Sequence, residues 1–263
     1  MRATLKSALA CLAILLCSAR TQSQEIAVAA AADLKFAMGE LAGQFEKQTG
    51  TKVNVTYGSS GNFFTQMQNG APFDLFFSAD VDYAKRLEAT GQAEPRTLYN
   101  YAVGRIVIWM PPSVKADVNA QGMNALLDPA IQKIAIANPA HAPYGRAAVA
   151  ALKKAGIYEK VEAKLVYGEN ISQAAQFVQS GNAQAGIIAL SLAISPPMKD
   201  GKSWPVPAEM HPAIEQAAVV LKSAKNKGAA RAFLEFVKSK EGRATLEKFG
   251  FAIPKPDQGR PSH

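Results

Sequence analysis

Residues 69–80 read NGAPFDLFFSAD, and this stretch sets the pattern of the whole chain. Its middle, residues 73–77, is mostly apolar and follows Pro72, which is typical of a short strand buried in a sheet. Residues 79–90 then carry apolar side chains at helical spacing. A buried strand that leads straight into a helix predicts a βα unit, from which parallel sheets are built.

The same alternation extends outward from this unit in both directions. The sequence predicts further strands at residues 25–31, 53–57, 106–110, 131–137, 164–167, 185–189 and 216–222. It predicts helices at residues 34–49, 63–68, 145–155, 172–179 and 228–239. These units outnumber what one compact sheet holds, so we predict an α/β protein of two lobes, each a mostly parallel sheet flanked by helices. In such sheets ligands bind beyond the carboxyl ends of the strands, where the chain enters a helix.

The N-terminal segment has the features of an export signal. Arg2 and Lys6 precede an apolar stretch at residues 8–17, which is too short for a permanent membrane anchor. We therefore predict a cleaved signal peptide over residues 1–24 and a periplasmic mature protein. A lipoprotein anchored at Cys17 is the alternative, but the residue before that cysteine is larger than lipoprotein signal peptidases accept. Both cysteines of the chain lie in this segment, so we expect no disulfide and no thiolate site in the mature protein.

The composition excludes several classes of protein. The 263 residues are 48% hydrophobic, so the chain is not predominantly disordered, and its single long apolar run excludes a polytopic membrane protein. The net charge of +8 includes three basic residues of the N-terminal segment, and the other basic residues are scattered. We expect no nucleic acid as a partner, although a mildly positive surface helps to attract a small anion. Residues 257–263 are polar and are expected to form a loose tail.

Four predicted strand-to-helix junctions share a chemistry. They lie at residues 31–33, 58–62, 142–145 and 169–172. Each begins a helix, where backbone N–H groups lack intrahelical acceptors and the helix dipole is positive, so several converging junctions can bind a small oxyanion without a cationic side chain. Each junction on its own is better explained by ordinary helix capping. The Gly-Ser-Ser-Gly of the second junction is not followed by the Gly-Lys-Ser/Thr of a phosphate-binding loop, so nucleotide binding is not supported.

The sequence offers little for catalysis or metal binding. The three histidines lack the spacing of a metal site, and no Gly-x-Ser-x-Gly turn with a histidine partner is present. Asp74, Asp80 and Asp82 lie near one strand end, but a buried strand and a capped helix explain them more simply than a metal ion does. His141 lies beside Tyr144 without an obvious nucleophile, and we expect it to be a solvated loop residue. We expect no enzyme activity, no cofactor and no metal ion.

Six segments along the chain are characteristic when they occur together. They are AAAADL (29–34), YGSSGN (57–62), NGAPFDLFFSAD (69–80), NPAHAPYG (138–145), ENIS (169–172) and GIIALS (186–191). Their order resembles the periplasmic molybdate-binding proteins of ABC importers, over about residues 25–254. The resemblance implies two lobes that are joined by a two-stranded hinge and close over molybdate, and also over tungstate. The implied lobes are residues 25–101 with 216–256, and residues 102–215. We expect a monomer that delivers its ligand to the importer's membrane permease.

The same resemblance assigns the anion-binding positions. Ser60 would give its hydroxyl and its N–H, while the N–H groups of Tyr144 and Ile171 would come from the second lobe. The full set of implied ligand positions is Ala32, Asp33, Ser59, Ser60, Tyr144 and Ile171. Three further residues are expected to support the site from behind, namely Asn62, Arg146 and Asn170.

Asp33 departs from the family pattern, because relatives often carry Ser or Asn there and a carboxylate repels a dianion at short range. We expect Asp33 to turn back and cap its own helix, which leaves only its N–H for the ligand. Two other accounts stay open: pairing with Arg146 across the closed cleft, or protonation, which would let the carboxyl donate to the anion. The same repulsion keeps open a ligand other than molybdate. A tyrosine hydroxyl that some relatives offer at the end of the strand at 185–189 is absent from this sequence.

Two other functions compete with molybdate capture. The first is a receptor of the same fold for a different oxyanion or a small carboxylate. Carboxylate binders use a buried arginine fork, and Arg146 is the one arginine beside the four junctions. The second is a secreted hydrolase with Ser59 or Ser60 as its nucleophile. The sequence assigns no base to either serine, so the hydrolase is the weaker hypothesis.

Overall fold

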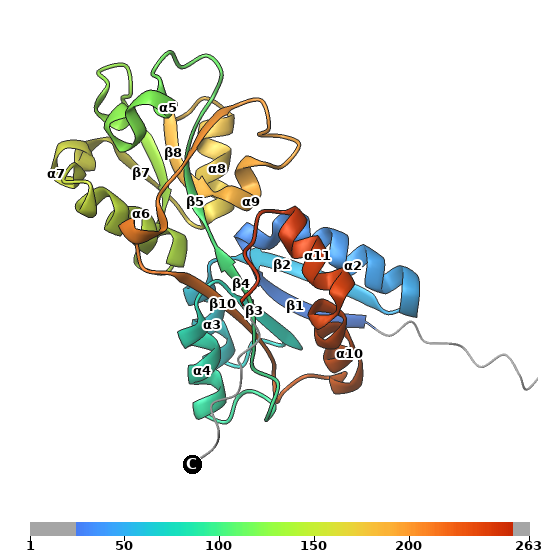
Figure 1. Cartoon of the computed structure of the whole chain (residues 1–263). Helices are drawn as coiled ribbons and strands as arrows, with labels where there is room; N and C mark the ends of the chain where they lie inside the picture. The colour runs from blue at the N-terminus through green and yellow to red at the C-terminus, as the bar shows by residue number, and fades with distance from the viewer. Residues whose placement is uncertain (1–24, 255–263) are drawn as a thin grey trace, which may run out of the picture.

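The computed structural model describes residues 25–254, which fold around two five-stranded sheets (Figure 1). The two sheets form a lower and an upper lobe in this view, here called lobe I and lobe II. The predicted signal peptide (1–24) and the predicted tail (257–263) lie outside the described residues. Within residues 25–254, no helix is long and apolar enough to cross a membrane.

Lobe I is built on the sheet with strand order β2-β1-β3-β10-β4. Its strands are β1 (Glu25–Ala31), β2 (Lys52–Gly58), β3 (Leu75–Ser78), β4 (Tyr99–Gly104) and β10 (Ile214–Val220). Its helices are η1 (Ala32–Leu34), α2 (Lys35–Thr49), α3 (Ser60–Gln68), α4 (Val81–Ala89), α10 (Lys227–Lys238) and α11 (Lys240–Lys248). All four residues of β3 are buried, as the apolar run at its position predicts.

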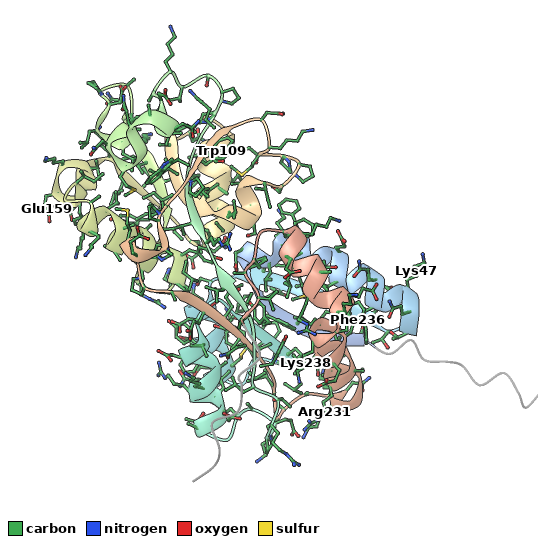
Figure 2. The ribbon with its side chains drawn as sticks, in the orientation of Figure 1. Lys47, Trp109, Glu159, Arg231, Phe236 and Lys238 are labelled. Atoms are coloured by element: carbon green, nitrogen blue, oxygen red, sulfur yellow. The ribbon has the colours of Figure 1, made fainter. Side chains whose placement is uncertain are left out.

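Lobe II is built on the sheet with strand order β7-β6-β8-β5-β9. Its strands are β5 (Ile106–Met110), β6 (Ile134–Ala137), β7 (Leu165–Gly168), β8 (Ala185–Ala189) and β9 (Lys202–Pro205). Its helices are α5 (Val118–Gln121), η2 (Gly122–Leu127), α6 (Pro143–Lys154), α7 (Tyr158–Val161), η3 (Glu162–Lys164), α8 (Ile171–Gln179), α9 (Leu190–Ala193) and η4 (Ala208–Met210). Trp109 lies inside this lobe, where its ring N–H donates to the carbonyl of Met198 at 3.0 Å, while Glu159 points outward (Figure 2).

Both sheets are mixed, with three parallel strands and two that complete the sheet in antiparallel pairings. β2, β1 and β3 are parallel, as are β7, β6 and β8. β10 is antiparallel to β3, and β5 is antiparallel to β8. The antiparallel direction of β5 and β10 follows from the path of the chain between the lobes. The parallel strands run toward the junction between the lobes, whereas β5 and β10 arrive from the other lobe and therefore run away from it.

The two lobes are joined by a two-stranded hinge, as predicted. β4 and β10 pair in antiparallel fashion, and their register shifts between Gln216 and Ala217. The chain leaves lobe I after Gly104 and enters β5 at Ile106. The parallel strands of both lobes bring their carboxyl ends to this junction, which is where ligands bind in such sheets. The precise residue bounds of the two lobes stay a prediction.

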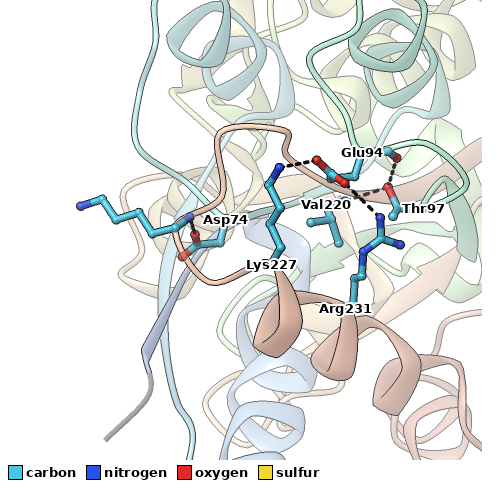
Figure 3. A network of polar contacts seen from close by, with 7 residues as sticks. Asp74, Glu94, Thr97, Val220, Lys227 and Arg231 are labelled. Carbon is cyan, nitrogen blue, oxygen red and sulfur yellow. Dashed lines mark hydrogen bonds and ion pairs between the residues drawn. The ribbon is translucent and has the colours of Figure 1, made fainter. Parts of the chain in front are cut away.

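Polar side chains inside lobe I serve its architecture. Asp74 accepts the N–H groups of Ala27 and Lys225, both at 2.7 Å, so its carboxylate ties β1 to the chain beyond β10. Glu94 accepts from Lys227 at 2.6 Å and from Arg231 at 3.1 Å (Figure 3), which holds the start of α10. These two hydrogen bonds lower the pKa of Glu94. Asp74 is thus a structural residue, as its sequence position suggests.

Candidate functional site

A small cavity lies at the junction of the lobes. Its wall is made by the ends of β1, β2 and β3 from lobe I and by the starts of α6 and α8 from lobe II. Its volume is about 10 Å³, which is room for about one water molecule. The residues in its wall include all six predicted ligand positions: Ala32, Asp33, Ser59, Ser60, Tyr144 and Ile171. The four junctions selected from the sequence thus converge on one point.

Ser60 is placed to donate its hydroxyl proton. The side chain is 1% exposed, and its Oγ accepts the N–H of Ala79 at 2.9 Å. A serine hydroxyl has one donor and two acceptor positions, so this bond occupies an acceptor position and leaves the proton available. The residue also begins α3, where its own N–H has no intrahelical acceptor.

The helix starts of lobe II add two backbone donors. Pro143 opens α6 and has no N–H, so Tyr144 is the first residue of that helix that can donate one. Ile171 opens α8, and its N-cap Asn170 accepts the N–H groups of the second and third helical residues. This cap leaves the N–H of Ile171 without an acceptor within the helix. That Asn170 supports an anion site in this way stays a prediction.

Ser59 is engaged across the cleft. Its Oγ lies 2.9 Å from Nδ1 of His141, and Nε2 of His141 lies 3.7 Å from a carboxylate oxygen of Glu169. The N–H of Gly61 donates to the carbonyl of His141 at 3.0 Å, and Asn62 donates to Glu169. The expectation that His141 is a solvated loop residue is wrong, because its side chain is 20% exposed and bridges the two lobes.

Ser59, His141 and Glu169 are the residue types of a catalytic triad, but they lack its arrangement. In a triad Nε2 of the histidine faces the serine and Nδ1 faces the carboxylate, which is the reverse of the order here. The three residues also meet only when the lobes touch, and Ser59 is then 5% exposed. The group therefore fits a contact that holds the cleft closed better than a nucleophile.

Asp33 does not cap its own helix, so that expectation is wrong. The turn η1 intervenes before α2, whose N-cap is Leu34 without a side-chain cap bond. The Oδ2 atom of Asp33 instead accepts from the hydroxyl of Tyr144 at 2.8 Å and from Nε2 of Gln216 at 2.7 Å. Its Oδ1 atom is buried and has no hydrogen-bond partner among residues 25–254.

Pairing of Asp33 with Arg146 is also contradicted. The guanidinium of Arg146 contacts the carboxylate of Asp80, which caps α4 by accepting the N–H of Asp82 at 2.9 Å. Arg146 thus links α6 to α4 across the lobe junction, and it is not in the wall of the small cavity. Arg146 therefore joins the lobes and is not placed to hold a carboxylate ligand in the small cavity.

Further hydrogen bonds close the junction around η1. Ser172 donates its hydroxyl to the carbonyl of Ala32, and Ser191 donates to the carbonyl of Asp33, both at 2.8 Å. Ser191 follows a buried strand in the sequence, which was the available signal for a role at the junction. Sequence reasoning did not identify either serine as a contact between lobes.

A buried polar cluster lies behind Asp33 at the hinge. Tyr101 donates to Oε1 of Gln216 at 2.6 Å and contacts the carbonyl of Ser78 at 3.2 Å. Burial raises the pKa of Asp33 to about 6, while the hydrogen bonds from Gln216 and Tyr144 and, more weakly, contacts with the backbone N–H groups of Asp33 and Leu34 act in the opposite direction. Burial also raises the pKa of both tyrosines well above the ordinary value, and the charge of Asp33 adds to this. Sequence reasoning did not identify Gln216 as part of this cluster. Its position as a polar residue in a mostly apolar strand was the signal that could have indicated a buried polar contact.

Two larger clefts flank the small cavity. One has a volume of about 400 Å³ and is lined by the start of α4, the start of α6 and residues 212–215. The other has a volume of about 440 Å³ and lies between the start of α2 and helices α8 and α9. The larger volumes do not make them better candidates for an oxyanion, because the four helix starts converge on the small cavity. Within residues 25–254, no group of three or more His, Cys, Asp or Glu side chains could hold a metal ion.

The sequence and the fold of this chain are similar to those of known proteins along most of its length. Residues 26–252 match the family described as bacterial extracellular solute-binding protein. The molybdate-binding protein ModA of Azotobacter vinelandii is 40% identical over 91% of this chain and 94% of its own length. The protein of the same name from Rhodobacter capsulatus is 38% identical over 86% of this chain and 88% of its own length. The solved structure of the Azotobacter vinelandii periplasmic molybdate-binding protein superposes with a TM-score of 0.82, at 34% identity, covering 88% of this chain and 100% of that one.

Proposed function

Because the chain belongs to the bacterial extracellular solute-binding proteins, we propose that it is a receptor that captures molybdate, and also tungstate, for an ABC importer. The observation that carries this proposal is the convergence of four helix starts and the hydroxyl of Ser60 on one cavity between two lobes. The names of the relatives supply the ligand, since the protein is about two-fifths identical to molybdate-binding proteins along nearly its whole length.

The mechanism is anion capture by neutral donors. The wall of the cavity contains no lysine, arginine or histidine side chain, so the charge of the anion is met by backbone N–H groups, helix dipoles and a hydroxyl. These donors are fixed before binding, and they replace the hydration shell of the anion. Cavity size would then select among oxyanions, because molybdate and sulfate offer the same acceptors.

Capture requires the lobes to part and close again. The cavity of about 10 Å³ is smaller than a tetrahedral oxyanion. Four pairs of residues, each with one member in either lobe, make contacts across the closed junction. The hinge formed by β4 and β10 is where this movement takes place. The closed protein, acting as a monomer outside the cytoplasm, would present both lobes to the membrane permease.

A receptor for a small carboxylate is less well supported. Such receptors hold the carboxylate in an arginine fork, and Arg146 is already paired with Asp80 outside the cavity. A different oxyanion remains the competing ligand, because nothing in the donor set distinguishes molybdate from its analogues.

A thermal-shift scan tests the proposal. The mature protein is heated with molybdate, tungstate, sulfate, phosphate or chromate, each at about 1 mM. A ligand present at 1,000 times its dissociation constant stabilises the folded state by about 4 kcal/mol, which raises the midpoint by several degrees. We expect large shifts with molybdate and tungstate and none with sulfate. A shift with sulfate or phosphate alone would overturn the assignment of the ligand, and no shift with any oxyanion would overturn the receptor function.

A further inference from the structure

Asp33 combines a fully buried carboxyl with one unsatisfied oxygen in the wall of an anion site. The residue is 1% exposed and lines the cavity. Its Oδ2 atom is satisfied by two donors, Tyr144 and Gln216, whereas Oδ1 has no partner among the described residues. A buried oxygen without a hydrogen-bond partner is unusual in a folded protein and calls for an explanation.

Among residues 25–254, no basic side chain forms an ion pair with this carboxyl. The hydroxyls of Tyr144 from α6 and Tyr101 from β4 face Asp33, and both are neutral because burial raises their pKa well above the ordinary value. Strand β2, which packs on η1, contributes Tyr57, and burial raises its pKa to about 12. Helices α8 and α9, which pack on η1, carry no ionisable side chain. The nearest basic residue along the chain, Lys35 at the start of α2, is exposed. A bound dianion would therefore meet an uncompensated negative charge if Asp33 were ionised.

A protonated carboxyl removes both difficulties at once. A carboxylic acid has one O–H donor and keeps acceptor capacity on its other oxygen. The Oδ2 atom already accepts hydrogen bonds from Tyr144 and Gln216, so the proton is placed on Oδ1. The unsatisfied oxygen then becomes a donor in a cavity that is otherwise lined by donors, and the repulsion of the anion disappears.

We propose that the protein captures its oxyanion together with one proton, which is held on Oδ1 of Asp33 and donated in a hydrogen bond to the anion. This inference rests on the proposed function, because it requires an oxyanion in the cavity. The proton comes from solvent when the lobes close, and no covalent bond other than this O–H is made. Asp33 is then a ligand-binding residue whose protonation makes the affinity for the anion depend on pH.

The direction of the pH dependence follows from linkage. Burial in the closed protein raises the pKa of Asp33 to about 6 even before the charge of an anion is added. A carboxyl with a higher pKa in the closed, liganded form than in the open form takes up a proton on binding. Binding is therefore strongest below the pKa of the open form, and it weakens as the pH rises, by up to about tenfold per pH unit.

Proton uptake can be counted directly by calorimetry. Molybdate is titrated into the full-length mature protein at pH 7 in two buffers that differ in ionisation enthalpy, and the difference in heat gives the protons taken up. We expect close to one proton for the parent protein. Asp33→Asn keeps an oxygen that accepts from Tyr144 and Gln216, and it offers an N–H₂ group in place of the O–H. The variant should therefore take up no proton on binding molybdate. It should also bind molybdate more tightly than the parent protein at pH 8. Asp200→Asn, a change of an exposed aspartate, is the matched control and should take up as many protons as the parent.

The outcomes separate this inference from the proposed function. Molybdate binding with no proton uptake by the parent would overturn the role of Asp33 and leave the receptor function intact. Equal uptake by the parent and Asp33→Asn would assign the proton to another group and also overturn it. Binding by none of the proteins would count against the proposed function itself, and thermal melting of Asp33→Asn would show whether that variant is folded. A pH series from 5.5 to 8 supplies the second readout: a falling affinity in the parent and a flat profile in Asp33→Asn.

Discussion

The hydroxyl of Ser60 has two partners in the proposed complex, and its removal should therefore have two effects. Its Oγ accepts the N–H of Ala79, and its proton is proposed to meet the anion. Ser60→Ala should weaken molybdate binding by about 1–3 kcal/mol, and it should lower the free energy of unfolding because the N–H of Ala79 is left buried without a partner. Calorimetry and urea unfolding without ligand measure the two losses. Ser113→Ala, at an exposed serine, is the control. Parental affinity in Ser60→Ala would remove this residue from the site.

At the same scale, Asp33 shows where sequence reasoning reaches its limit. An aspartate before a helical pattern is usually an N-cap, and that local rule predicted the wrong role. The turn η1 displaces the residue from the cap position, and the groups that bind its carboxyl are 111 and 183 positions away in the sequence. That Ser60, Tyr144 and Ile171 lie in one cavity wall was easier to predict, because their placement depends on where helices begin. Their contact with an anion stays a prediction.

At the scale of elements, strand β4 and helix α6 approach so closely that only glycine fits at residue 104. A Cβ atom there would lie 2.2 Å from the hydroxyl of Tyr144 and 2.7 Å from Nε2 of Gln216. Gly104→Ala should displace Tyr144 and disfavour closure by about 1–3 kcal/mol, since both neighbours are buried in one cluster. We expect molybdate affinity to fall about 5- to 150-fold, which corresponds to that energy.

Small-angle scattering checks the structural part of this prediction. Gly104→Ala should remain more open than the parent protein when molybdate is present. Gly39→Ala is the matched control, because a Cβ atom at that position of α2 meets nothing within 4 Å. Closure of Gly104→Ala to the parental dimensions, with parental affinity, would contradict the idea that β4 and α6 must touch in the liganded state.

The elements themselves were largely predictable, for a physical reason. Buried parallel strands are short apolar runs and the helices that follow them have apolar faces, so both leave local periodicities in the sequence. β9 and α11 were not predicted. β9 is four residues long and only partly buried, and α11 is mostly polar, so neither leaves a strong pattern. The antiparallel direction of β5 and β10 depends on the crossing between lobes, which no local pattern encodes.

At the scale of the whole molecule, closure is maintained by contacts that ring the cavity from several elements. Ser59 and Asn62 at the start of α3 meet His141 and Glu169 of lobe II, while Arg146 meets Asp80 on another side. The sequence predicted two lobes and their hinge, but it could not predict these pairs, because each joins positions that only the closed form brings together. Such contacts change the balance between open and closed forms without touching the ligand.

His141 offers the sharpest test of that balance. His141→Ala removes the contacts of its ring with Ser59 and Glu169 while leaving every proposed ligand donor in place. A hydrogen bond contributes about 0.5–1.5 kcal/mol net, so molybdate should dissociate about 2- to 10-fold faster, with the association rate nearly unchanged. Stopped-flow displacement by excess tungstate measures the dissociation rate, and His211→Ala, at a half-buried histidine that contacts only the neighbouring carbonyl of Pro212, is the control. Ser59→Ala should also speed dissociation, and the double variant should be no faster than His141→Ala, because His141→Ala already removes the contact between the two residues. Additive effects would mean that Ser59 acts on the anion directly instead of through His141.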